Sequence, residues 1–307
     1  MLKQWLRPLV RPLPQWSTVA IAPPSDVVTA TLCWHGKTED VTRDHTVAAL
    51  KPLVIATSVE AGQHPELEYR DRATGVLLGV LQLTRMASLV VEERSIALYH
   101  VTAGEHCCLR WPRRSWNRWL QNRSMRKASS SQYALMEPAA VQQLMIAYLC
   151  PRPVVLVSVG APAHQNIFPM DLIGPLERSG FFSLALRSTN VSQSVMREAR
   201  HVALSGMPAQ MKPIVYRLSE HHKHPLTDWS ALPFPVRPSQ QFGIPAVAAA
   251  LRVQELSILH SEEIGSHTFF LGRFVSDEKY ADGAQLHHTA GFHQAYRLRY
   301  GPPFVMV

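Results

Sequence analysis

The sequence has little cysteine and no long hydrophobic run. Its 307 residues include four cysteines, none of them in a CxxC spacing, so neither a disulfide framework nor a zinc site is indicated. The longest apolar runs, such as 76–81 and 154–157, are far shorter than a membrane-spanning helix requires. These absences exclude a disulfide scaffold and a helical membrane protein, and we expect a reducing, cytoplasmic setting.

Acidic residues and nucleotide-binding motifs are also scarce. The chain has 31 Lys and Arg against 23 Asp and Glu, which gives a net charge of +8 and favours an anionic partner. It contains no GxGxxG, no P-loop and no internal repeat that can be seen in the sequence. The 46% of hydrophobic residues exclude a disordered chain, and the length favours two domains.

The first 25 residues contain no acid but five prolines. These prolines interrupt the apolar segment of a secretory signal and are a poor fit to the amphipathic helix of a transit peptide. We therefore expect residues 1–25 to form an arm on the domain surface.

The first half of the chain has the pattern of a β-rich domain. Short apolar runs rich in β-branched residues predict strands at 27–34, 52–57, 76–83, 88–92 and 96–101. A basic stretch, 110–127, follows with no acid between Glu105 and Glu137, and it predicts a surface helix. Trp116 and Trp119 share one helical face, which favours packing against the domain. We place the domain boundary near Leu135, giving domains 1–135 and 136–307.

The second half mixes strands with a few helices. A proline in the first turn, followed by apolar residues at helical spacing, predicts a helix over 137–148. Strands are expected at 154–159 and 181–187, with a helix between 189 and 200. A long hairpin is expected from 251–260 and 267–275. The fold class is therefore mainly β with a few helices.

Four segments of the second half occur in an informative order. They are Arg152-Pro-Val-Val-Leu-Val-Ser158, Asn166-Ile-Phe-Pro-Met170, Leu186-Arg-Ser-Thr-Asn190 and Gly265-Ser-His-Thr-Phe-Phe-Leu-Gly-Arg273. This order, over about residues 138–280, resembles the flavin reductase-like family, whose fold is an FMN-binding split β-barrel. The resemblance implies that such a barrel follows the additional N-terminal β-rich domain. It also implies a homodimer, because members of the family usually dimerise.

The resemblance assigns the flavin contacts residue by residue. Asn166 and Met170 would lie along the flavin ring, and the segment containing Arg187, Ser188, Thr189 and Asn190 would receive the FMN phosphate. The chemistry is suitable, because a guanidinium fork, hydroxyls and a helix N-terminus all bind phosphate. Ser192 can cap the helix that follows. The alternative is that Asn190 and Ser192 are ordinary N-cap residues that serve only the helix.

His267 is the candidate catalytic residue. In the family, a histidine of the late hairpin lies near the flavin and the nicotinamide, and a neutral imidazole there can bind the nucleotide or help move a proton. The alternative is a strand histidine that is satisfied by a backbone carbonyl. One departure concerns turnover: many members have Asp-Pro-Pro before the second long strand, where this chain has Leu176-Glu-Arg-Ser-Gly180.

Three other features indicate weaker alternatives. The segment Glu220-His221-His222-Lys-His224, with His287-His288 and His293 as possible partners, is better explained as an exposed loop than as a metal site, so no metal is expected. Binding of nucleic acid by the 110–127 stretch is unlikely without a motif. The adjacent Cys107 and Cys108 are most simply buried strand cysteines.

The sequence thus predicts an FMN-binding oxidoreductase that transfers hydride from NADH or NADPH to flavin. A non-catalytic FMN carrier or sensor is the alternative, which the missing Asp-Pro-Pro favours. A partner-binding or nucleic-acid-binding module that has lost the flavin is a third hypothesis. We further expect the N-terminal domain to pack on the barrel as a degenerate second copy and to cover part of the flavin site.

Overall fold

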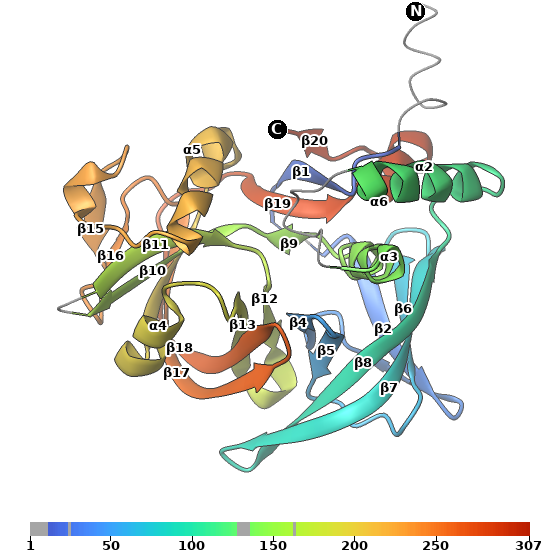
Figure 1. The fold of residues 1–307 in the computed structure, drawn as a ribbon, viewed down its shortest axis with the longest axis horizontal. Coiled ribbons are helices and arrows are strands. Elements are labelled where there is room, and N and C mark those ends of the chain that lie inside the picture. The colour runs from blue at the N-terminus through green and yellow to red at the C-terminus, as the bar shows by residue number, and fades with distance from the viewer. Residues whose placement is uncertain (1–11, 24–25, 128–135, 162–163) are drawn as a thin grey trace, which may run out of the picture.

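A computed structural model describes residues 12–23, 26–127, 136–161 and 164–307 (Figure 1). The first half forms one seven-stranded antiparallel sheet with the strand order β3-β2-β6-β7-β8-β5-β4. Its strands are β2 (Val28–Trp34), β3 (Lys37–Asp40), β4 (His45–Leu50), β5 (Leu53–Thr57), β6 (Glu66–Asp71), β7 (Leu77–Val91) and β8 (Arg94–His106).

The second half forms another seven-stranded antiparallel sheet, in the order β11-β10-β14-β17-β18-β13-β12. Its strands are β10 (Val155–Ala161), β11 (His164–Met170), β12 (Ile173–Leu176), β13 (Phe181–Arg187), β14 (His201–Gly206), β17 (Arg252–Ile264) and β18 (His267–Lys279). The predicted long hairpin is therefore present, as β17 and β18. A two-stranded sheet of β15 (Val236–Pro238) and β16 (Pro245–Val247) lies in the insertion before β17.

The two large sheets have the same topology. If the seven strands of each sheet are numbered from 1 to 7 in chain order, both sheets have the spatial order 2-1-5-6-7-4-3. Each sheet also has a long hairpin at the corresponding place, β7–β8 in one and β17–β18 in the other. The chain is therefore an internal repeat at the level of topology, which the sequence does not show. This agrees with the hypothesis of a degenerate second copy.

The two halves share one hydrophobic core. All six residues of β4 are buried, and this strand packs against β12, β13 and β18 of the other sheet. The core of the first half extends without a break to Leu172, Phe181 and Phe269 of the second. In Figure 1, β4 and β5 lie between the rest of the first sheet and the strands β12 and β13. No closed barrel forms among the strands described, so the expected split barrel is represented by open sheets.

The N-terminal arm does not simply lie on the surface. Its described part contains β1 (Trp16–Ile21), which pairs along its whole length with β19 (Gln285–Ala290). Together with β9 (Arg152–Pro153) and β20 (Val305–Met306), these strands form a four-stranded sheet. The alternation of buried and half-buried residues in β1 explains the pairing, because every second side chain faces the core. The surface-arm prediction is thus wrong for these residues.

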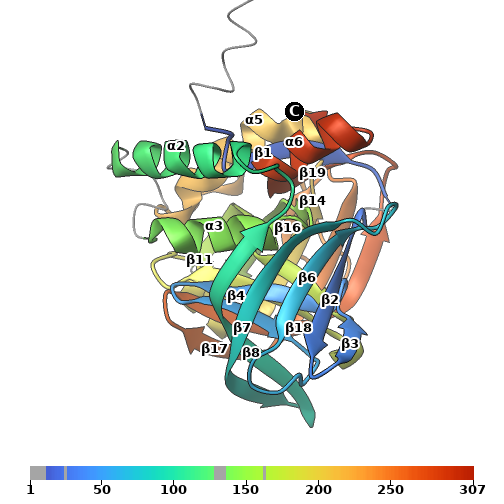
Figure 2. The ribbon, with the colours of Figure 1, turned by 90° about the vertical axis from the view of Figure 1, so that its right-hand side faces the viewer.

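Five α-helices are present in the described part of the chain. They are α2 (Arg113–Lys127), α3 (Pro138–Ala147), α4 (Gln193–Ala199), α5 (Lys212–Arg217) and α6 (Gly291–Tyr300). Helix α3 begins with the expected proline but packs on β7 and β8, the sheet of the first half (Figure 2). Helix α3 follows the predicted boundary near residue 135 but packs on the first half, and β1 precedes it but pairs with β19 of the second half. The boundary itself stays a prediction.

Helix α2 confirms the surface helix predicted for the basic stretch. However, Trp116 and Trp119 do not pack against the domain: their side chains are 45% and 47% exposed and stack on each other, with 4.9 Å between ring centroids. Asn117 and Leu120 are buried instead. In the described residues, no helix is both long and apolar enough to cross a membrane.

Candidate functional site

A cavity of about 900 Å³ brings together most of the predicted flavin residues. Met170 at the end of β11, Arg187 at the end of β13, and His267 at the start of β18 all line it, together with Thr189 and Asn190 of the loop before α4. Its volume is at the upper end of the range for sites that bind cofactor-sized ligands. Residues up to about 100 positions apart in the chain thus line one cavity.

Arg187 and His267 are direct neighbours across the β13–β18 ladder. The His267 side chain is only 1% exposed, and its Nδ1 lies 2.9 Å from Oγ of Ser266. Burial and the nearby Arg187 charge lower the pKa of His267 from 6.5 to about 4. The imidazole is therefore neutral at ordinary pH, and the fixed positive charge at this end of the cavity comes from Arg187.

The loop before α4 is held by its own polar contacts. Asn190 Nδ2 donates to Nδ1 of His222 over 2.5 Å, and its Oδ1 accepts the backbone N–H of Ser192 over 2.8 Å. Thr189 is exposed and lines the cavity, whereas the exposed Ser188 does not. The backbone N–H of Ser188 donates to the carbonyl oxygen of Ser266, which ties the loop to the β17–β18 turn.

Asn166 and Ser192 lie outside the cavity lining. Asn166 is 1% exposed, and its Nδ2 donates to Ser192 Oγ over 2.7 Å and to the carbonyl oxygen of His221 over 2.8 Å. Its Oδ1 accepts the backbone N–H groups of Ile167 and Leu226. Ser192 stands at the N-cap position of α4, but its side chain does not cap the helix. Direct flavin contacts by Asn166 and Ser192 stay predictions, and their observed contacts are structural.

The cavity also has a polar wall that the sequence did not predict. Asp171 follows β11, Tyr216 ends α5, and His288 lies on β19, and all three line the cavity. Nδ1 of His288 donates to Oδ2 of Asp171 over 2.6 Å, and Nε2 of His288 is hydrogen-bonded to the hydroxyl of Tyr216. The sequence indicates His288 only as a possible metal ligand, because no sequence motif links it to Asp171.

The first half of the chain contributes to the same cavity. Leu50 at the end of β4 lines it, as do Trp16 and Thr18 of β1. The turn after β4 meets the β17–β18 turn, where the backbone N–H of Ser266 donates to the carbonyl oxygen of Lys51 over 2.9 Å. Because His267 is the next residue, this contact helps fix its position. The N-terminal half thus covers part of the predicted site.

The segment that replaces Asp-Pro-Pro is used for contact between the halves. Leu176 ends β12, and Glu177–Ser179 form a 3-10 turn. Within this turn, Glu177 pairs with Arg43 over 2.6 Å, and the backbone N–H of Arg178 donates to Oδ1 of Asp44 over 3.0 Å. In this structure the segment joins the second half to the turn before β4 of the first half.

Asp44 in the first half lies at a position that corresponds to Asp171 in the second half. It stands just before β4, as Asp171 stands shortly before β12. Ser58, which follows β5, donates to Asp44 through its backbone N–H over 3.1 Å and its hydroxyl over 3.0 Å. Burial on its own raises the pKa of Asp44 further than these hydrogen bonds lower it. The buried carboxyl group of Asp44 therefore links the start of β4 to the end of β5 through its hydrogen bonds with Ser58.

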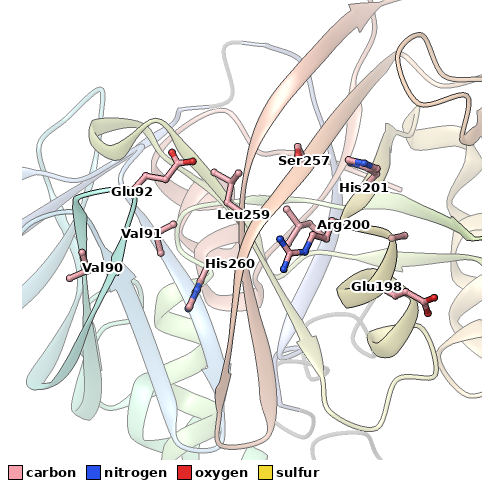
Figure 3. Close-up of a pocket in the computed structure, with 11 residues that line it drawn as sticks. Val90, Val91, Glu92, Glu198, Arg200, His201, Ser257, Leu259 and His260 are labelled. Atoms are coloured by element: carbon pink, nitrogen blue, oxygen red, sulfur yellow. The ribbon is translucent and has the colours of Figure 1, made fainter.

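A second hollow of about 660 Å³ lies away from these residues (Figure 3). Val90, Val91 and Glu92 of the β7–β8 hairpin stand on one side, and Glu198 and Arg200 of the α4 end stand on the other. Between them, Leu259 and His260 belong to β17. Glu92 is paired with Arg273 over 2.6 Å. None of the predicted flavin residues lines this hollow, which is a surface groove between the β7–β8 hairpin and the end of α4.

The remaining sequence features do not form a separate site. No group of three metal-ligating side chains occurs among the residues that the structure describes. The His221–His224 segment is not merely an exposed loop, because His222 and His224 line the cavity and Nδ1 of His221 lies 2.8 Å from the carbonyl oxygen of Ile167. Burial raises the pKa of both Cys107 and Cys108, which makes neither an activated thiol.

No family model matches the chain, and no curated protein matches it. Solved structures similar to parts of it include an FMN-binding protein from Thermus thermophilus, at 22% identity over 42% of this chain and 72% of that one, with a TM-score of 0.37. An NADH:FAD oxidoreductase from Streptomyces globisporus has 19% identity over 50% of this chain and 89% of its own, with a TM-score of 0.43.

A third similar structure is the flavin reductase component of a bacterial two-component tryptophan halogenase. It has 15% identity over 48% of this chain and 92% of its own length, with a TM-score of 0.43. Flavin reductases and FMN-binding proteins are therefore the kinds of protein that these similar structures represent.

Proposed function

We propose that the cavity binds FMN and that the chain is a flavin oxidoreductase supplied with hydride by NADH or NADPH. The observation that carries this proposal is the meeting of Met170, Arg187, Thr189, Asn190 and His267 around one cavity. The family resemblance, which depends on the order of four sequence segments, implies the same residues as flavin contacts.

The cavity has the chemical features that FMN requires. Arg187 and Lys212 place two cationic side chains on its walls, which suits a phosphate group. Met170, Leu186 and Tyr148 add apolar and aromatic surface, which suits a planar ring system. The neutral His267 can accept or donate a hydrogen bond without adding charge beside Arg187.

A bound flavin would supply the two-electron chemistry, since hydride transfer from a nicotinamide needs geometry rather than a protein acid or base. The chain would bind and orient the two ring systems through the residues above. The expected homodimer stays a prediction. Within the chain, Leu50, Trp16 and Thr18 supply the wall of the cavity that lies nearest the first half.

The visible spectrum of the purified protein, before and after anaerobic addition of NADH or NADPH, tests the proposal. Flavin absorption bands that bleach on addition are the expected result. Bands that persist would favour the alternative, a non-catalytic FMN carrier or sensor. A colourless protein that takes up no added FMN would exclude both functions.

A further inference from the structure

A chain of polar side chains lines the cavity, and flavin binding as proposed above uses only the ring of Tyr148 among them. The hydroxyls of Thr18 and Tyr216 lie 2.6 Å apart, and Tyr216 is hydrogen-bonded to Nε2 of His288. On its other side, His288 donates to Asp171 over 2.6 Å, and the hydroxyl of Tyr148 donates to the same carboxylate oxygen over 2.9 Å. All five side chains line the cavity.

These side chains come from parts of the chain that are distant in sequence. Thr18 and His288 are partners in the β1–β19 ladder, Tyr216 ends α5, and Asp171 follows β11. Figure 1 shows β1, β19 and α5 close together at one end of the molecule. The side chain of His288 is 14% exposed and that of Asp171 is 24% exposed, so the arrangement is open to the cavity rather than sealed in the core.

The protonation states of Asp171 and Tyr216 indicate in which direction a proton can move along these side chains. Burial alone would raise the pKa of Asp171, but its hydrogen bonds with His288 and Tyr148 outweigh burial and lower it, so Asp171 is a carboxylate. Burial raises the pKa of Tyr216, and this outweighs the hydrogen bond with Thr18. A carboxylate, an imidazole and a protonated phenol thus follow one another, which is the order in which a proton can pass from the imidazole to the phenol.

We propose that Tyr216 is a general acid that protonates the oxygen of an aromatic quinone bound in the cavity. His288 is a positioning residue that returns a proton to Tyr216, and Asp171 holds His288 in place. The quinone class is chosen because Trp16, Tyr148 and Tyr216 give the same cavity aromatic walls on which a planar conjugated ring can stack. The inference rests on the proposed function for its hydride.

The step is balanced as a two-electron reduction. The quinone receives one hydride equivalent from the nicotinamide nucleotide and one proton from the Tyr216 hydroxyl, and it leaves as a hydroquinone. The hydride equivalent supplies both electrons and the hydrogen of one hydroquinone O–H group, and the nicotinamide leaves oxidised as its C–H bond is broken. The O–H bond of Tyr216 is broken to supply the hydrogen of the other O–H group, while the two carbonyl π bonds are replaced by the aromatic ring. A proton from solvent then returns to Tyr216 through His288. General acids in this role typically contribute a rate factor of about 10²–10⁴.

Binding of 4-nitrophenol tests the acid site without any flavin. This planar phenol is coloured when ionised, so its absorption reports both binding and ionisation at the site. We expect Tyr216→Phe to weaken its binding about 10-fold to 100-fold, because one hydrogen bond to a charged oxygen is lost. Tyr300→Phe is the matched control, since Tyr300 is exposed and does not line the cavity, and it should leave the affinity unchanged.

Asp171→Asn separates the relay from a structural role. In this variant His288 loses its carboxylate partner, so a smaller fraction of the bound 4-nitrophenol should be ionised than in the wild-type protein at the same pH. Thermal melting of each variant shows that the fold is retained. An unchanged ionised fraction in a folded Asp171→Asn variant would contradict the relay.

Quinone reduction by the FMN-loaded protein completes the test. Tyr216→Phe should lower quinone turnover, expressed per bound FMN, about 100-fold, because phenylalanine keeps the ring but has no proton to give. Equal probe binding and equal quinone turnover in Tyr216→Phe and wild type would overturn the inference, as would a wild-type protein that does not bind the probe. Failure to bind FMN would instead overturn the proposed function, and the 4-nitrophenol measurements would still decide the acid site.

Discussion

Lys51 and Ser266 join the two halves of the chain through two hydrogen bonds. The backbone N–H of Ser266 donates to the carbonyl oxygen of Lys51 over 2.9 Å, and the backbone N–H of Lys51 donates to Oγ of Ser266 over 3.1 Å. Lys51 follows Leu50 and Ser266 precedes His267, and both of these neighbours line the cavity. The contact between two structural repeats therefore also sets the distance between two walls of the site.

Gly265→Ala should disrupt this contact. Gly265 has a φ of +54°, and a Cβ at this position would collide with the carbonyl oxygen of Lys51. The left-handed conformation costs an alanine about 1–2 kcal/mol, and the collision adds to it, so we expect the free energy of unfolding to fall by more than about 2 kcal/mol. Urea denaturation monitored by tryptophan fluorescence measures this loss.

Gly243→Ala is the matched control. Gly243 has a φ of +66°, but a Cβ there would meet no atom within 4 Å. This variant should therefore show the conformational cost alone. Equal losses in the two variants would mean that the Lys51–Ser266 contact tolerates the extra methyl group.

Arg187→Ala should weaken FMN binding by about 10-fold to 100-fold, because a hydrogen-bonded charge pair with the phosphate is worth about 1.5–3 kcal/mol. Quenching of FMN fluorescence during titration measures the affinity. Arg197→Ala serves as the control, since Arg197 is an exposed arginine of α4 that pairs with Glu263 over 2.6 Å and does not line the cavity. An Arg187→Ala variant with wild-type affinity would show that the phosphate is bound elsewhere.

The chain should bind one flavin rather than two, although it contains the same sheet topology twice. In the first half, Asp44 joins the strand ends that match those of the cavity, through Ser58 and the backbone of Arg178. Strand β5 ends on Thr57 where the matching strand β13 ends on Arg187, so the first half lacks the cation that is proposed to bind the phosphate. The ratio of flavin released on denaturation to protein concentration should be close to one per chain. A ratio near two would show that the first half has kept a site.

Much of the secondary structure could be predicted from local patterns. The strand at 27–34, the helix that begins at Pro138 and the late hairpin are present because β-branched runs and capping residues act over a few residues. The runs 76–83 and 88–92 are predicted as separate strands but form the single strand β7, because residues between them also pair with β8. Strand β1 was missed because its partner β19 lies at the other end of the chain.

In the candidate site, too, residues within one sequence segment can be recognised together, whereas residues that are distant in the sequence cannot. Arg187, Thr189 and Asn190 lie in one segment, and the family resemblance implies them as phosphate contacts, which stays a prediction although all three line the cavity. Asp171 and His288 could not be paired from sequence, since 117 positions separate them and only the fold brings them within 2.6 Å. The repeated topology was also invisible, because the two sheets share their strand order without a repeat that can be seen in the residues.

The stability of the chain should fall steeply between pH 6.5 and pH 4. Burial is the largest cause that lowers the pKa of His45, His106, His267 and His287 to about 4 and that of His293 to about 3. Above pH 6.5 these groups are neutral in both the folded and the unfolded chain, so they add no pH dependence. As the pH falls, the unfolded chain binds protons that the folded chain excludes, and each histidine can cost up to about 2 kcal/mol by pH 5. Urea denaturation at pH 7 and pH 5 measures the change, and the variant His293→Gln should show a smaller fall than wild type. Equal stabilities at the two pH values would mean that these imidazoles accept protons inside the folded chain.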